Sequence, residues 1–166
     1  MQKIFALALL MCSCSSLAHS EDDQPGADMP KDCVAKAMEI GQETDSEFKR
    51  MSHTVIAFQP PLRGTNLLTV DCGPGSAIGG PGISLYWQTA FPPAAYYELL
   101  AKAGAVLTGE SQSALLAATK SCAKQALAEE TEMADQLTAK AKIECHAFVR
   151  NGGSVGTFIY LRDKDD

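Results

Sequence analysis

The chain has 166 residues, of which 46% are hydrophobic and 20% are charged. This composition is typical of one folded domain and argues against a disordered chain. The formal net charge is −6 and the isoelectric point is near 5.0. These values argue against a general nucleic-acid-binding protein, because such proteins are normally basic.

The first 20 residues have the pattern of a secretory signal peptide. Lys3 supplies a positive charge, residues 4–12 form a short apolar run, and Ala18-His19-Ser20 places small residues before a cleavage point at Glu21. The apolar run is far shorter than the ~20 residues that a membrane-spanning helix needs, and no later segment comes close. We therefore expect an exported chain without a transmembrane span, periplasmic in a bacterium and otherwise secreted. A buried N-terminal helix is the alternative.

A lipid anchor is a second way to interpret this region. Cleavage before Cys12 or Cys14 would leave a cysteine that could carry lipid, as in a structural lipoprotein. After cleavage at residue 20, we expect residues 21–29 to form an acidic, flexible leader. Residues 30–166 would then form a single domain.

The first half of that domain is predicted to be one helix followed by three strands. Pro30 can begin a helix and Gly41 can end it, with apolar side chains at helical spacing between them. Runs rich in β-branched and aromatic residues, separated by proline and glycine, predict strands at 48–59, 65–72 and 83–89. The last two strands are joined by the long, glycine-rich segment 73–82.

The second half is predicted to be two helices followed by a hairpin. Pro92-Pro93 opens a helix that Gly104 ends or loosens, and Thr108 or Ser111 caps a second helix that runs to about residue 132. Apolar residues then alternate with polar ones over 137–149, which predicts a long strand with one buried face. Asn151-Gly152 predicts a tight turn into a last strand at 155–162.

Helices and strands are segregated in this order, α-βββ-αα-ββ. Segregation favours the α+β class over an alternating fold with a parallel sheet. We therefore predict an antiparallel sheet of about five strands with the helices packed on one face.

Four cysteines remain outside the signal peptide: Cys33, Cys72, Cys122 and Cys145. An even number in an exported chain indicates disulfides, and three pairings are possible. Cys33–Cys72 and Cys122–Cys145 are favoured because each pair joins neighbouring elements. No C-x-x-C spacing is present and no histidine has a ligand partner at the usual spacing, so we expect no metal and no cofactor.

Two short motifs suggest hydrolysis. Residues 152–156 (GGSVG) match G-x-S-x-G, the nucleophile elbow of α/β-hydrolases, with Ser154 as the nucleophile. That motif needs a strand-to-helix turn and a later histidine, whereas this segment falls in a hairpin and no histidine follows it. The glycines therefore favour a flexible turn.

The second motif is Asp71-Cys72-Gly73, which resembles the cysteine neighbourhood of the NlpC/P60 cell-wall peptidases. The resemblance covers three residues and implies Cys72 as a nucleophile with His146 as a possible base. The family's cysteine begins a helix, which lowers the pKa of its thiol. Here Pro74 and a glycine-rich stretch follow, so a disulfide role for Cys72 is favoured.

Three features could form a binding surface. The segment 73–82 lacks the lysine and the following helix of a phosphate-binding loop, so it is either a mobile connection or a recognition loop. Aromatic residues gather around positions 86–97 and are interpreted either as core or as an exposed surface. An acidic run near the end of the second long helix is either a solvated face or a contact for a basic partner. The candidate residues are Gly75, Ile78, Gly79, Gly80, Trp87, Phe91, Tyr97, Glu129 and Glu130.

No complete catalytic constellation is present in the sequence. The favoured hypothesis is an exported, disulfide-stapled small protein that acts by binding another protein or an envelope component. One concrete form is a periplasmic inhibitor or immunity-type protein. An envelope hydrolase that uses Cys72 or Ser154 and a structural lipoprotein are the alternatives.

Overall fold

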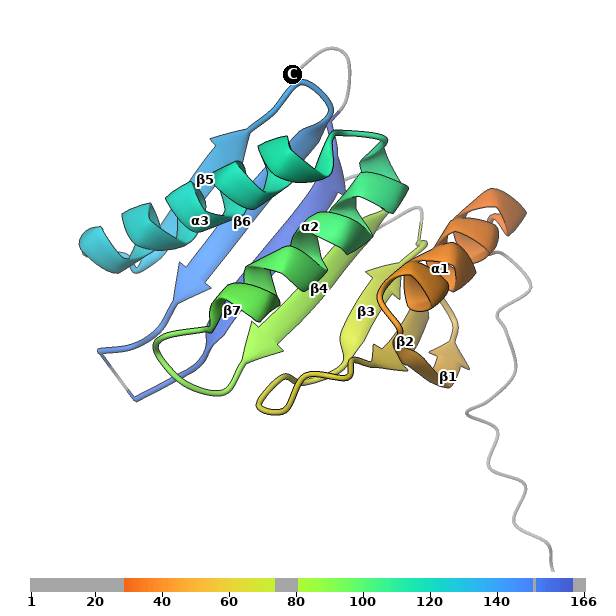
Figure 1. Cartoon of the computed structure of the whole chain (residues 1–166), viewed down its shortest axis with the longest axis horizontal. Helices are drawn as coiled ribbons and strands as arrows, with labels where there is room; N and C mark the ends of the chain where they lie inside the picture. Colours follow the sequence, from red (N-terminus) through yellow and green to blue (C-terminus); the bar gives the residue numbers. More distant parts are fainter. Residues whose placement is uncertain (1–28, 74–80, 151, 163–166) are drawn as a thin grey trace, which may run out of the picture.

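Apolar residues at every second position along the strands pack against apolar faces of the helices, and the result is a two-layer α+β fold. In the computed structural model, which describes residues 29–73, 81–150 and 152–162, three helices cover one face of a seven-stranded sheet (Figure 1). The elements are α1 (Lys31–Glu43), β1 (Glu47–Ser52), β2 (Val55–Gln59), β3 (Leu68–Asp71), β4 (Gly82–Trp87), α2 (Ala94–Thr108), α3 (Gln112–Ala128), β5 (Met133–Leu137), β6 (Ala141–Ala147) and β7 (Val155–Leu161).

All neighbouring strands are antiparallel, in the order β1-β2-β3-β4-β7-β6-β5. Two meanders, β1 to β4 and β5 to β7, therefore meet at the β4–β7 pair in the middle of the sheet. Helix α1 packs on β2, α2 on β4 and β7, and α3 on β5 and β6. This arrangement confirms the predicted class, the antiparallel sheet and the single helical layer.

The number of strands is seven rather than the predicted five. The predicted strand 48–59 is a hairpin, because the chain turns at His53 and Thr54 without glycine or proline to mark it. The predicted strand 137–149 is also interrupted. A tight turn closes at Thr138, whose backbone N–H donates to the Ala141 carbonyl at 2.8 Å.

Two predicted helix ends were wrong as well. Helix α2 passes through Gly104 and ends at Thr108, with Gly109 in the left-handed conformation (φ 68°) as its cap. Helix α3 ends at Ala128 rather than near residue 132. Ser111 caps α3, since its hydroxyl accepts a hydrogen bond from the Ala114 N–H at 3.2 Å.

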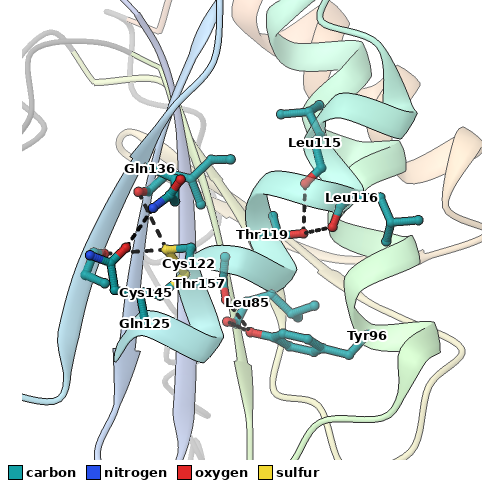
Figure 2. The surroundings of a disulfide bond; sticks show 12 residues. Leu85, Tyr96, Leu115, Leu116, Thr119, Cys122, Gln125, Gln136, Cys145 and Thr157 are labelled. Atoms are coloured by element: carbon teal, nitrogen blue, oxygen red, sulfur yellow. Dashed lines mark hydrogen bonds between the residues drawn. A yellow bond between two sulfur atoms is a disulfide. The ribbon is translucent and has the colours of Figure 1, made fainter. Parts of the chain in front are cut away.

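Each disulfide ties a helix to the meander that follows it. Cys33 of α1 is bonded to Cys72 at the end of β3, and Cys122 of α3 is bonded to Cys145 of β6. Figure 2 shows the second bond between helix and sheet. The predicted pairing is confirmed.

The core lies between the helices and the sheet, and Tyr96 of α2 is the largest side chain buried in it. The Tyr96 hydroxyl donates to the Leu85 carbonyl of β4 at 2.8 Å and lies 3.1 Å from the Thr157 hydroxyl of β7 (Figure 2). These contacts fix α2 on the central strand pair.

Candidate functional site

The second face of the sheet carries no helix in the described part of the chain. Cross-strand pairing identifies the residues on this helix-free face, because directly opposed residues share a face. Ser84 of β4 pairs with Phe158 of β7, which pairs with Glu144 of β6. Their neighbours Ile83 and Ile159 point to the helices and are fully buried.

Aromatic rings are concentrated on the helix-free face over β4, β7 and β6. Phe158 contacts Tyr86 edge-on, with centroids 5.6 Å apart, and lies 4.9 Å from the His146 ring. His146 in turn contacts Phe148 at 5.5 Å, and Phe158 stacks on Tyr160 at 6.3 Å. These five residues are called the aromatic cluster below.

Two glycines allow rings of the cluster to lie flat on the sheet. A Cβ atom at Gly156 would lie 2.7 Å from Cε1 of Tyr86, and one at Gly82 would lie 2.6 Å from Cδ1 of Tyr160. Each tyrosine therefore covers the strand next to its own, across the β4–β7 pair. The two rings therefore lie against neighbouring backbone instead of standing upright, and Tyr160 is buried as a result.

The tyrosine hydroxyls of the cluster stay uncharged at neutral pH. Burial raises the pKa of the Tyr86 and Tyr160 phenols, so both hydroxyls remain hydrogen-bond donors. Beside them Lys142 and Glu144 form an ion pair at 2.8 Å. The site thus combines two phenol groups with a paired charge at its margin.

A shallow groove of about 490 Å³ borders the cluster on the β1 side. Its floor follows from side-chain size, because Thr69 and Ser84 are neighbouring short residues on β3 and β4. Arg50 of β1 bounds the groove on one side and Tyr86 of β4 on the other. We call this the polar groove, and its lining is Arg50, Gln59, Thr65, Asn66, Leu67, Thr69, Ser84 and Tyr86.

The groove has unused hydrogen-bonding capacity. The Arg50 guanidinium and the Asn66 carboxamide have no hydrogen-bond or ion-pair partner among the described residues. The Thr69 and Ser84 hydroxyls share one bond of 2.6 Å, which leaves each with further acceptor or donor capacity. In the part of the chain that the structure describes, no acidic side chain lines this groove.

The candidate residues from the sequence lie elsewhere. Gly75, Ile78, Gly79 and Gly80 fall outside the described residues, as do the signal peptide and the leader to residue 28. Trp87 and Tyr97 are partly buried against the core, and each contacts the Tyr96 ring. Phe91 is exposed in the β4–α2 connection. The three aromatic residues thus lie on the helix side of the sheet or at its end.

The acidic run has an internal partner. The Arg150 guanidinium donates to the carbonyls of Glu129 and Glu130 at 3.0 and 2.8 Å. Glu132 is buried, and its carboxylate accepts the Arg150 backbone N–H at 2.8 Å. These bonds hold the α3–β5 connection on the β6–β7 loop, although the side chains of Glu129 and Glu130 remain exposed.

The two nucleophile candidates are not set up for catalysis in this structure. The Cys72 sulfur is bonded to Cys33, so it is not available as a thiolate. Ser154 lies between β6 and β7, as expected for a hairpin, and no hydrogen bond joins its hydroxyl to a histidine or carboxylate within the described residues.

The described residues contain neither a metal-binding cluster nor a membrane-spanning helix. No group of three or more histidine, cysteine, aspartate or glutamate side chains in 29–73, 81–150 and 152–162 is placed to hold a metal ion. Over the same residues, no helix is both long and apolar enough to cross a bilayer. Comparison of the chain with family models, curated proteins and solved structures finds no match.

The sequence contains a signal for the helix-free face. In β7, Val155, Thr157, Ile159 and Leu161 alternate toward the helices, which leaves Phe158 and Tyr160 on the opposite face. Aromatic residues at the outward positions of a central strand indicate a surface made for contact. The polar groove carried no comparable signal, since its lining comes from four strands and a loop.

Proposed function

We propose that this protein is an exported binding protein that holds its partner on the helix-free face of the sheet. The aromatic cluster is the observation that supports this function. Tyr86 and His146 join aromatic area with polar atoms, and Phe148 and Phe158 add apolar rings. Such a composition is typical of interface hot spots. An antiparallel sheet with one solvent-facing side normally carries polar residues on that side, so an aromatic centre there is unusual.

The rigid scaffold suits a binding role. Two disulfides fix α1 and α3 on the sheet, and such bonds persist in oxidising compartments outside the cytoplasm. The cluster is carried by three hydrogen-bonded central strands, so its geometry is set before a partner arrives. A preorganised surface loses less conformational entropy on binding than a loop does.

Site-specific photo-crosslinking tests the proposal. A benzophenone side chain replaces either Met133, which pairs with His146 on the helix-free face, or Lys120, which is exposed on α3. Both variants are expressed in the native host, and the adducts are identified by mass spectrometry. We expect a discrete adduct from position 133 and none from position 120. Adducts from position 120 alone would place the binding surface on the helices and contradict the proposal.

A further inference from the structure

We infer that the polar groove binds a carboxylate-bearing hexose, with Arg50 holding the carboxylate and Tyr86 packing against the sugar ring. This inference rests on the proposed function and names the chemistry of the ligand at one part of the same face.

Arg50 determines the acidic group of the ligand. Its guanidinium lines the groove without a partner among the described residues, in a chain of net charge −6. A guanidinium binds a carboxylate through two parallel hydrogen bonds. Among the described residues one cation lines the groove, which suits a monoanion, whereas a polyanion would be repelled by the acidic protein.

The rest of the lining indicates a polyhydroxylated ring. Gln59 and Asn66 offer amides, and Thr69 and Ser84 offer hydroxyls, all within the same groove. A sugar ring carries hydroxyl groups on several sides and can match such a set. A lone acidic side chain from a protein would leave most of these groups unmatched, and unmatched polar groups cost affinity when they lose water.

Tyr86 supplies the apolar contact. Its ring lies over Gly156 and borders the groove, so a C–H face of a sugar bound in the groove can contact it. The negative face of an aromatic ring attracts the weakly positive C–H groups. The groove volume of about 490 Å³ lies within the range of about 300–1,000 Å³ that is usual for small-ligand sites.

Two matched pairs of sugars test the inference. The ¹⁵N-labelled mature protein, with both disulfides intact, is titrated with N-acetylmuramic acid and with N-acetylglucosamine, which lacks the carboxylate. A second pair is glucuronic acid and glucose. We expect an acidic sugar to shift the amide signals of Ala57, Thr69 and Ser84, and its neutral counterpart to bind about tenfold more weakly. The pair with the larger difference in affinity between its acidic and neutral sugar shows where the groove prefers the carboxylate. A larger difference for glucuronic acid places it directly on the sugar ring, and a larger difference for N-acetylmuramic acid places it on a side group.

Arg50→Gln is the decisive variant, and Lys49→Gln is its control. Arg50 is exposed, so its loss should not disturb folding, and Lys49 is already paired with Glu47 at 2.7 Å and does not line the groove. We expect Arg50→Gln to weaken the acidic sugar about tenfold while the neutral sugar is unchanged, and Lys49→Gln to change neither.

Three results would overturn the inference: no shift with either acidic sugar, no effect of Arg50→Gln, or an equal effect of both variants. A negative titration with a crosslink from position 133 would remove the sugar and leave the binding function standing. Crosslinks from position 120 alone would remove the binding function itself.

Discussion

The Tyr96 hydroxyl is the best place to test how the helical layer supports the sheet. It is fully buried, and it lies 2.8 Å from the Leu85 carbonyl and 3.1 Å from the Thr157 hydroxyl. Tyr96→Phe removes the donor and leaves Thr157 with an unmatched group inside the core. A buried hydrogen bond contributes roughly 0.5–1.5 kcal/mol, and an orphaned polar group adds a desolvation cost. We therefore expect Tyr96→Phe to lower the free energy of unfolding by about 2 kcal/mol.

A double-mutant cycle isolates the pair. Thr157→Val removes the second hydroxyl with little change in shape, and alone we expect it to cost about 1 kcal/mol. The double variant has no unmatched hydroxyl, so its cost should be smaller than the sum of the single costs by about 0.5–1 kcal/mol. Urea unfolding followed by circular dichroism gives these values. Strict additivity would show that the two hydroxyls do not interact and would refute the reasoning.

Three other predictions concern the disulfides, the cluster and pH. The double variant Cys33→Ala/Cys72→Ala opens a loop of 39 residues, and we expect its free energy of unfolding to fall by about 3.9 kcal/mol. Urea unfolding under oxidising conditions measures this loss, and a change below about 1 kcal/mol would contradict the prediction. Gly156→Ala forces the Tyr86 ring off the sheet, so we expect the free energy of unfolding to fall by about 1–3 kcal/mol. The NMR signals of the Tyr86 ring should shift strongly. Unchanged ring signals would count against the flat packing. Burial raises the pKa of all four tyrosines, so the folded chain holds their protons while the unfolded chain releases them from about pH 10. These groups should therefore leave the free energy of unfolding unchanged below pH 10 and lower it above pH 10. Tyrosinate absorbance should appear at a lower pH in urea than in buffer. Identical absorbance titrations in urea and in buffer would contradict burial of the tyrosines.

Periodicity and cysteine spacing were enough to predict the class, the helical layer and both disulfides. The two missed turns have a physical explanation. The turn at His53 and Thr54 contains no glycine or proline, and the turn at Thr138 is closed by its own backbone and hydroxyl bonds to Ala141. Alternation continued through the turn at Thr138 in the sequence, although Leu137 and Ala141 lie on opposite faces of the sheet.

The candidate site was less accessible to sequence reasoning. Aromatic density along the chain indicated Trp87 and Tyr97 as either core or surface residues, and both pack against the core. The aromatic cluster instead joins residues from β4, β6 and β7, which only the strand order brings together. Arg50 reaches the groove through the register of β1 on β2, which no local pattern fixes.

Oxidative footprinting in intact cells decides whether a partner occupies the helix-free face. Met133 on that face and Met38 on α1 are matched probes, since they are 46% and 39% exposed. Phe148 of the cluster and Phe91 of the β4–α2 connection form a second pair, 39% and 77% exposed. Relative to the purified protein, we predict that Met133 and Phe148 become protected in cells while Met38 and Phe91 react as before. Protection of Met38 with full reactivity of Met133 and Phe148 would contradict binding on the helix-free face.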